Sequence, residues 1–132
     1  MLRDVYSGYL RLMGEEHEET IRTANNYAAS LYNLQSFEEA KLLLRRTVPV
    51  ARRVLGESYD VTLRMRWNYA DALCRAAGAT LDDICEGVTT LEEIEPTARR
   101  VLGSAHPLTA GIERSLRAVQ AAIDRQVRAH SA

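Results

Sequence analysis

The 132-residue sequence has only two cysteines, one tryptophan and one phenylalanine, and its formal net charge is −1. Cys74 and Cys85 are too few for a disulfide framework, and their spacing is not that of a CxxC pair. A nearly neutral chain has no overall attraction to nucleic acid or to an anionic membrane. The sequence also lacks an apolar run of about 18 residues and an apolar signal-peptide core. We therefore expect a cytoplasmic protein with free thiols and no cofactor.

A repeated stretch is the strongest positive feature of the sequence. Residues 51–56 and 98–103 both read AlaArgArgValLeuGly. Six residues after the glycine of each copy stands a threonine, Thr62 or Thr109, and Gly14 precedes Thr20 by the same interval. A recurrence at this period predicts a helical repeat array. The repeats divide the chain into a partial unit at 1–13, complete units at 14–55 and 56–102, and a final partial unit at 103–132.

The spacing of apolar residues predicts that each complete unit is a pair of helices. Ile21, Ala24, Ala28 and Leu31 follow the helical spacing of three and four residues, and a second such stripe begins at Phe37. The polar pair at 35–36 separates the two stripes, so the helices should form an antiparallel hairpin. Adding the single helices at both ends gives about six helices and no strand, which is an all-α fold.

The second unit contains five additional residues near 76–83. Gly78 is expected to end its first helix there, and Thr80 with Asp83 is expected to cap the next helix. Pro49 and Pro96 occupy the same repeat position inside helical stripes. Each proline should kink its helix, and the alternative is that the helix ends and restarts there.

Several motifs together resemble a known family. They are Gly-x-x-His-x-x-Thr, AsnAsnTyrAla at 25–28, PheGluGluAla at 37–40 and ArgArgValLeuGly at 52–56. The pattern looks like the 42-residue tetratricopeptide repeat of the kinesin light chain type. This resemblance implies hairpins stacked into a right-handed solenoid, with the first helix of each hairpin lining a concave groove that binds a peptide or protein. Tyr59 departs from the family pattern, because the family has histidine at that position. In such a stack, Ala28 and Ala70 are expected where helices approach closely. The expected core residues are Tyr27, Leu31, Phe37, Ala40, Leu44, Tyr69 and Leu73.

The resemblance also implies which residues line the groove. Asn26 and Asn68 occupy the position from which the family's asparagine binds a peptide backbone, and an amide both donates and accepts hydrogen bonds. Helical spacing places further candidates on the same face. They are Arg22, Asn25, Ala29, Tyr32 and Asn33 in the first unit, and Arg64, Trp67, Asp71 and Arg75 in the second. Solvent exposure for the asparagines, and packing between repeats for Trp67, are the alternatives that the sequence leaves open.

Other reactive residues fit structural roles better than catalytic ones. His17 and His106 recur at helix starts and are expected to cap helices rather than to bind a metal. Cys74 and Cys85 are expected to be small buried residues. The arginine pairs on the second helices alternate with glutamates, which predicts a salt-bridged face. No nucleophile, base and orienting group can be assembled, so we expect no enzyme.

The two ends of the array lack a neighbouring repeat. Natural arrays close with polar helices, and the last helix is polar enough to be such a cap, whereas Val5, Tyr9 and Leu10 make the first helix less polar. We therefore expect either a segment of a longer array or self-association through the N-terminal helix. The leading functional hypothesis is a protein-binding module, and the alternative is a structural segment without a groove ligand.

Overall fold

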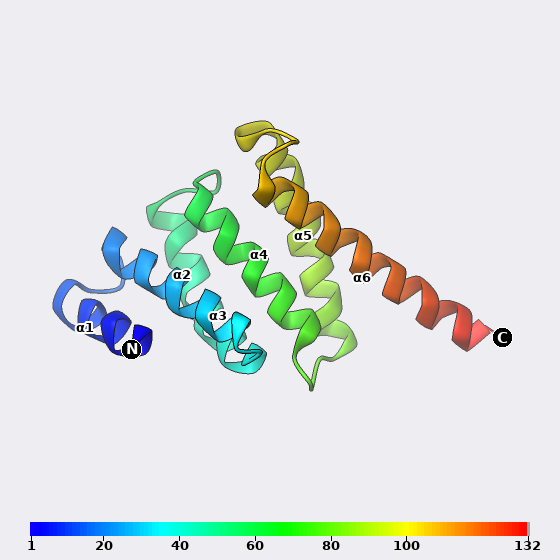
Figure 1. The fold of residues 1–132 in the computed structure, drawn as a ribbon, viewed down its shortest axis with the longest axis horizontal. Helices are drawn as coiled ribbons and strands as arrows, with labels where there is room; N and C mark the ends of the chain where they lie inside the picture. The colour runs from blue at the N-terminus through cyan, green and yellow to red at the C-terminus, as the bar shows by residue number, and fades with distance from the viewer. Residues whose placement is uncertain (132) are drawn as a thin grey trace.

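The computed structural model describes residues 1–131, which form six helices (Figure 1). These are α1 (Leu2–Met13), α2 (Glu18–Asn33), α3 (Phe37–Val54), α4 (Asp60–Arg75), α5 (Leu81–Leu102) and α6 (Pro107–Ser131). No strand occurs in this range, so the predicted all-α fold with six helices is confirmed. None of these helices combines the length and the apolar character that crossing a membrane requires.

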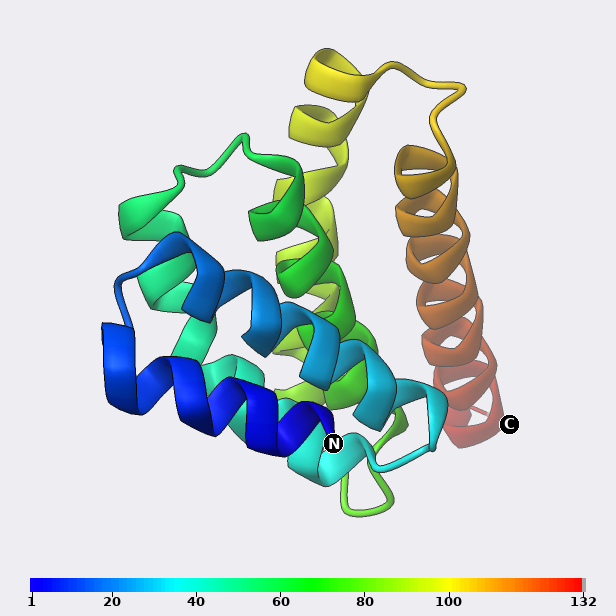
Figure 2. The ribbon, with the colours of Figure 1, turned by 60° about the vertical axis from the view of Figure 1, so that its left-hand side comes forward.

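The helices form two layers. Each helix packs against the next one along the chain, and in addition α2 contacts α4 and α4 contacts α6. Within residues 1–131, the backbones of α1, α3 and α5 do not approach one another, although a side-chain ion pair of 4.0 Å joins Arg45 of α3 to Glu86 of α5. We call α2, α4 and α6 the inner layer and α1, α3 and α5 the outer layer. The arrangement is consistent with a tetratricopeptide repeat solenoid, with α1 and α6 at opposite ends of the stack (Figures 1 and 2).

Side chains cap the starts of α2, α5 and α6 at the positions that the sequence predicts. His17 Nδ1 accepts a hydrogen bond from the Glu19 amide at 3.1 Å, and His106 Nδ1 accepts one from the Leu108 amide at 3.0 Å. Both histidines are therefore helix caps, as the sequence predicts. Thr80 and Asp83 form a reciprocal capping box at the start of α5.

The prediction that Gly78 ends α4 is wrong by a few residues. The helix ends at Arg75, because Ala76 already has an extended backbone with φ −60° and ψ 141°. Both proline-containing helices are continuous, so the alternative of a helix that ends and restarts is also wrong. Pro49 and Pro96 are exposed, and their rings therefore displace no core side chain.

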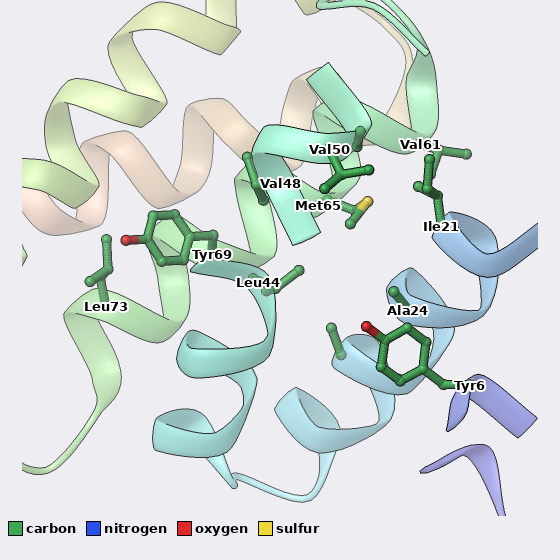
Figure 3. Packing of buried hydrophobic residues seen from close by; sticks show 12 residues of the cluster. Tyr6, Ile21, Ala24, Leu44, Val48, Val50, Val61, Met65, Tyr69 and Leu73 are labelled. Atoms are coloured by element: carbon green, nitrogen blue, oxygen red, sulfur yellow. The ribbon is translucent and has the colours of Figure 1, made fainter. Parts of the chain in front are cut away.

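The largest core cluster lies where α2, α3 and α4 meet (Figure 3). Leu44 and Leu73 are fully buried in it, as the sequence predicts, and Tyr69 is 8% exposed. Ala28 and Ala70 have no exposed surface, which confirms that small residues stand where helices approach closely. Tyr27 and Phe37 were expected in the core and are only partly buried, at the edge of a smaller cluster of Leu31, Ala40 and Ala72.

The recurring threonine joins the repeats. Thr20 Oγ1 donates to the carbonyl oxygen of Tyr9, and Thr62 Oγ1 donates to that of Ala51, both at 3.4 Å. Each acceptor lies eleven residues before its threonine, in the preceding outer helix. The threonine thus ties the start of α2 to α1 and the start of α4 to α3, whereas the Thr109 hydroxyl at the start of α6 is buried without a partner in the described chain.

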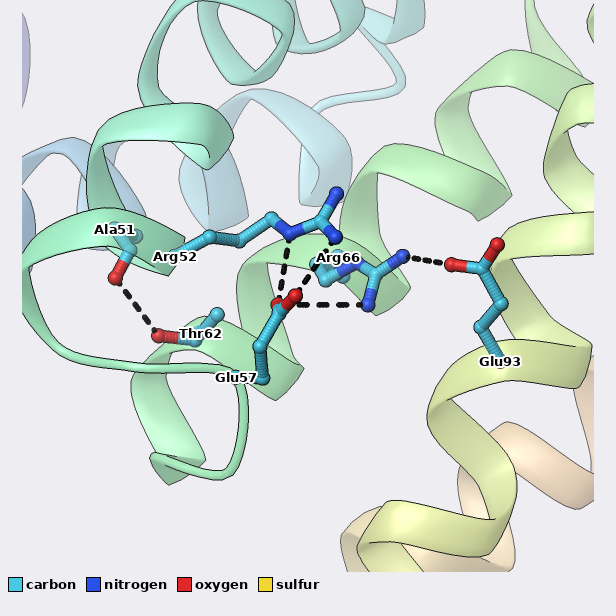
Figure 4. A network of polar contacts seen from close by, with 6 residues as sticks. All are labelled: Ala51, Arg52, Glu57, Thr62, Arg66 and Glu93. Atoms are coloured by element: carbon cyan, nitrogen blue, oxygen red, sulfur yellow. Dashed lines mark hydrogen bonds and ion pairs between the residues drawn. The ribbon is translucent and has the colours of Figure 1, made fainter.

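Arg66 makes a second connection on the outer side of α4 (Figure 4). Its guanidinium is nearly buried and pairs with Glu57 and with Glu93 of α5. Glu57 also accepts two hydrogen bonds of 2.7 Å from Arg52 of α3, which lowers the pKa of Glu57. This cluster bridges α3 and α5, which the Arg45–Glu86 ion pair also joins, and confirms part of the predicted salt-bridged face.

The core assignment predicts a selective loss of stability. Leu73→Ala should lower the free energy of unfolding by about 2–5 kcal/mol, because it leaves a cavity in a fully buried site. Urea unfolding followed by circular dichroism measures the change. Leu34→Ala is the matched control, since Leu34 is 73% exposed and its loss should cost no more than about 0.5 kcal/mol. Equal losses in the two variants would contradict this core.

Candidate functional site

The residues predicted to line a groove all lie on the inner helices α2 and α4. On α2, the residues Arg22, Asn26, Ala29 and Asn33 follow one another at three- or four-residue intervals and are exposed or half-buried. The matching row on α4 includes Arg64, Asn68 and Arg75. These rows face away from the outer helices, because the opposite sides of α2 and α4 carry the core residues.

The two asparagines at the centre of the rows are available to a ligand. Asn26 is exposed and Asn68 is half-buried. Side-chain hydrogen bonds of α2 and α4 within residues 1–131 use neighbours such as Arg22, Tyr32 and Asp71, and leave both asparagine amides without a partner. Each amide therefore keeps its donors and acceptors free, which is the property that the sequence hypothesis requires of them.

Asp71 connects all three inner helices. Its Oδ2 accepts a hydrogen bond from the Tyr32 hydroxyl of α2 and another from Ser115 Oγ of α6, both at 3.2 Å. Ser115 Oγ in turn accepts a bond of 2.9 Å from the indole nitrogen of Trp67. These hydrogen bonds join four side chains into a polar cluster, which we call the Asp71 junction: Tyr32, Trp67, Asp71 and Ser115.

Burial governs the electrostatics of this junction. Asp71 is 8% exposed, and burial raises the pKa of its carboxyl group against the opposing effect of the Ser115 and Tyr32 hydrogen bonds. Burial and the neighbouring Asp71 carboxylate raise the pKa of Tyr32 to about 12, so this phenol remains a proton donor. The Arg75 guanidinium lies 5.6 Å from the centre of the Tyr32 ring, in a cation–π contact.

Trp67 packs between repeats, which is one of the two roles that the sequence leaves open for it. Its ring lies directly over Gly111 of α6, where a β-carbon would come within 2.4 Å of Cη2. Only glycine at this position allows the ring to lie so close to the helix backbone. Together with the Ser115 hydrogen bond, this packing fixes α6 against α4.

Arg22, Arg64 and Asn25 have separate surroundings. Arg22 bonds to the Tyr59 hydroxyl at 2.6 Å and pairs with Glu18, which links α2 to the start of α4. Arg64 pairs with Asp60 at 3.7 Å on its own helix. Asn25 is half-buried, and its Oδ1 is shielded from solvent without a partner in the described chain. The predicted set is thus one face divided into several local groups.

A pocket of about 650 Å³ opens beside the Asp71 junction. It lies between the end of α4, the start of α5 and the C-terminal half of α6. Asp71 and Arg75 are at its rim, whereas Leu81, Ile84 and an α6 stripe line it with apolar side chains; the stripe consists of Ala118, Val119, Ala122, Ile123 and Val127. Arg125 adds a second cation. The inner face therefore ends in an apolar hollow with charged edges.

Sequence reasoning missed Ser115 and the α6 stripe. Ser115 stands six residues after Thr109, and Asn26 and Asn68 stand six residues after Thr20 and Thr62. The repeat register therefore pointed to Ser115, although the change of residue type concealed it. The pocket could not be predicted, because it depends on the angle at which α6 leaves α4 and α5.

The remaining reactive residues do not form a catalytic group with the junction. Cys74 is half-buried, and burial raises the pKa of its thiol to about 11, so it remains protonated. Cys85 is exposed, so the prediction that it is buried is wrong; it lies on the solvent side of the first turns of α5. Residues 1–131 contain no group of three histidine, cysteine or acidic side chains arranged for a metal.

The Trp67–Gly111 contact predicts an unusual effect of alanine in a helix. Gly111→Ala should destabilise the protein by about 1–3 kcal/mol, because the added methyl group meets the indole ring. Alanine normally stabilises a helix relative to glycine by about 0.5–1 kcal/mol. In a Trp67→Leu background, Gly111→Ala should instead stabilise the protein, as alanine normally does in a helix. Urea unfolding of the four proteins gives the coupling, and additive changes would contradict the contact.

The raised pKa of Asp71 predicts a pH effect on stability. The folded protein binds this proton more tightly than the unfolded chain, so stability increases as pH falls from the folded-state pKa towards the ordinary aspartate value. Asp71→Asn keeps the acceptor oxygen and removes the titration. The unfolding free energy of wild type minus that of the variant should therefore rise between pH 7 and pH 4. A fall over the same range would show that the folded protein stabilises the ionised carboxylate.

Comparison with known families agrees with this architecture. Residues 20–58, which span α2, α3 and the following turn, match the sequence model described as tetratricopeptide repeat. No curated protein matches the chain, and no solved structure matches it. The resemblance to kinesin light chains in particular stays a prediction. The match and the all-helical fold together support a tetratricopeptide repeat protein.

Proposed function

We propose that the inner face of α2, α4 and α6 binds an extended peptide segment of a partner protein. Tetratricopeptide repeats are in general protein-interaction modules, and nothing in the composition favours nucleic acid or a membrane as the partner. The observation that carries the proposal is the pair of uncommitted amides, Asn26 and Asn68, at equivalent positions of adjacent helices. Amides presented in this way suit the alternating donors and acceptors of a peptide backbone.

The pocket beside Arg75 would receive an apolar side chain of the same segment. Its lining is largely aliphatic, so the burial of one leucine-sized side chain would contribute about 1.5–3 kcal/mol. Neither Arg75 nor Arg125 has an ion-pair partner within residues 1–131. Both cations therefore lie at the rim without an acidic partner, where they would favour a segment that carries a carboxylate beside the apolar side chain.

A preformed binding face favours binding, because the ligand would have to order little of the protein. The Asp71 junction holds Tyr32, Trp67 and Ser115 in place beneath the row of amides. Asp71 and Trp67 act in this scheme as supports for the groove. Arg22, Asn26, Asn68 and Arg75 supply the contacts with the partner.

The test is an affinity capture from source-cell lysate with quantitative mass spectrometry. A partner that binds through the groove should be retained by wild type and lost, by tenfold or more (about 1.4 kcal/mol), with Asn26→Ala/Asn68→Ala. Both amides lie outside the core, so helicity and unfolding free energy should stay unchanged in the variant.

Glu39→Ala/Arg100→Ala is the matched control for this capture. Both residues are exposed on the outer helices α3 and α5, and the variant also removes two polar side chains. It should retain the same partners as wild type. Identical partners with all three proteins would place the interaction outside the groove and contradict the proposed function.

A further inference from the structure

We propose that α1 binds the α1 helix of a second copy of this chain, antiparallel and across a two-fold axis. The proposal concerns the end of the array opposite the pocket and does not depend on groove binding. It rests on three features of α1. They are an uncovered apolar stripe, a glycine at the centre of that stripe, and an acidic and a basic residue along one edge that would pair with the same edge of a second copy.

The apolar stripe is Met1, Val5 and Leu12, which are 96%, 40% and 80% exposed. Val5 and Leu12 are seven residues apart, about two helical turns, and therefore lie on one side of α1. The opposite side packs on α2 through Tyr6 and Leu10. No helix within residues 1–131 covers the stripe, and α1 forms one edge of the molecule (Figure 2).

The repeat register identifies the N-terminal half of this side as a helix-packing face. The alignment that matches Gly14 with Gly56 also matches Val5 with Thr47 and Gly8 with Val50. In α3, Thr47 and Val50 are 8% and 7% exposed, and they face Ile21 and Ala24 of α2. The side of α1 at Val5 and Gly8 thus corresponds to one that another helix covers in α3, whereas Leu12 matches Val54, which is 41% exposed.

Gly8 allows a second helix to come close at this point. It lies midway between Val5 and Leu12, and a β-carbon at Gly8 would have no neighbour within 4 Å. Small residues permit close approach of helix backbones. With the two-fold axis near Gly8, Val5 of each copy faces Leu12 of the other.

The charges at the edge of the stripe select a second copy as the occupant. Asp4 and Arg11 are exposed, seven residues apart, and without an ion-pair partner within residues 1–131. In an antiparallel two-fold pair, identical edges face each other, so Asp4 of each copy lies opposite Arg11 of the other. The corresponding residues of α3 are Arg46 and Arg53, whose equal charges would repel in the same arrangement.

The dimer should be weak and concentration-dependent. Each α1 has 12 residues and is therefore about 18 Å long, which is short for an interface that reaches the ~1,200 Å² of a stable complex. We expect a dissociation constant of the order of 100 μM. Sedimentation velocity of the full chain from about 10 μM to 1 mM spans the transition.

A charge exchange tests the geometry. Asp4→Arg and Arg11→Asp each place like charges opposite one another twice, and each should weaken dimerisation about tenfold or more. The double variant restores opposite charges and should dimerise as wild type does. Both substitutions also oppose the dipole of α1, so recovery in the double variant cannot arise from helix stability. Circular dichroism and unfolding at 10 μM verify the fold of each protein.

Leu12→Gln removes the apolar contact and keeps every charge. It should also weaken dimerisation without loss of helicity, because Leu12 does not contribute to the core. A wild type that is monomeric at 1 mM would overturn the proposal, as would oligomers that continue to grow with concentration. A dimer that the single charge variants leave unchanged, or that the double variant fails to restore, would equally overturn it.

Discussion

The Asp71 carboxylate is the point on which the inner layer depends. One oxygen accepts hydrogen bonds from Tyr32 of α2 and Ser115 of α6, while the residue itself belongs to α4. Burial makes the ionised group costly, and its two hydrogen bonds offset part of that cost. A hydrophobic residue would avoid the cost but could not define the angle of two neighbouring helices at once. The ionised carboxylate therefore lowers the stability of the folded protein at neutral pH, while its two hydrogen bonds join α4 to α2 and α6.

The two layers are held together by different interactions, and this difference separates their roles. The inner helices contact one another directly, through the Asp71 junction and through Trp67 on Gly111. The backbones of the outer helices do not approach one another in the described chain, and side chains join α3 to α5 through the Arg45–Glu86 ion pair and the Arg66 cluster. Thr20 and Thr62 connect α2 and α4 to the outer helix that precedes each of them. A ligand on the inner face would thus meet helices that contact one another directly.

Most of the fold could be predicted from the sequence, because repeat spacing and apolar periodicity are local properties. His17 and His106 were recognised as caps from their recurrence, and Leu44 and Leu73 as core from their spacing. The surroundings of Asp71 and Trp67 depend instead on how two repeats approach each other. Gly111 allows that approach through the absence of a side chain, and no periodic signal marks it. The pocket beside α6 arises in the same way from an angle between helices.

The most direct test of this account is the distance between α2 and α6 with and without the junction. Spin labels at Asn33 and Ala118, both exposed, would report it by pulsed electron paramagnetic resonance in a background without Cys74 and Cys85. With Asp71 present, the account predicts a single narrow distance distribution. Replacement of Asp71 by alanine should broaden or shift that distribution while helicity stays constant. The same narrow distribution in both proteins would show that apolar packing alone sets the geometry of the inner layer.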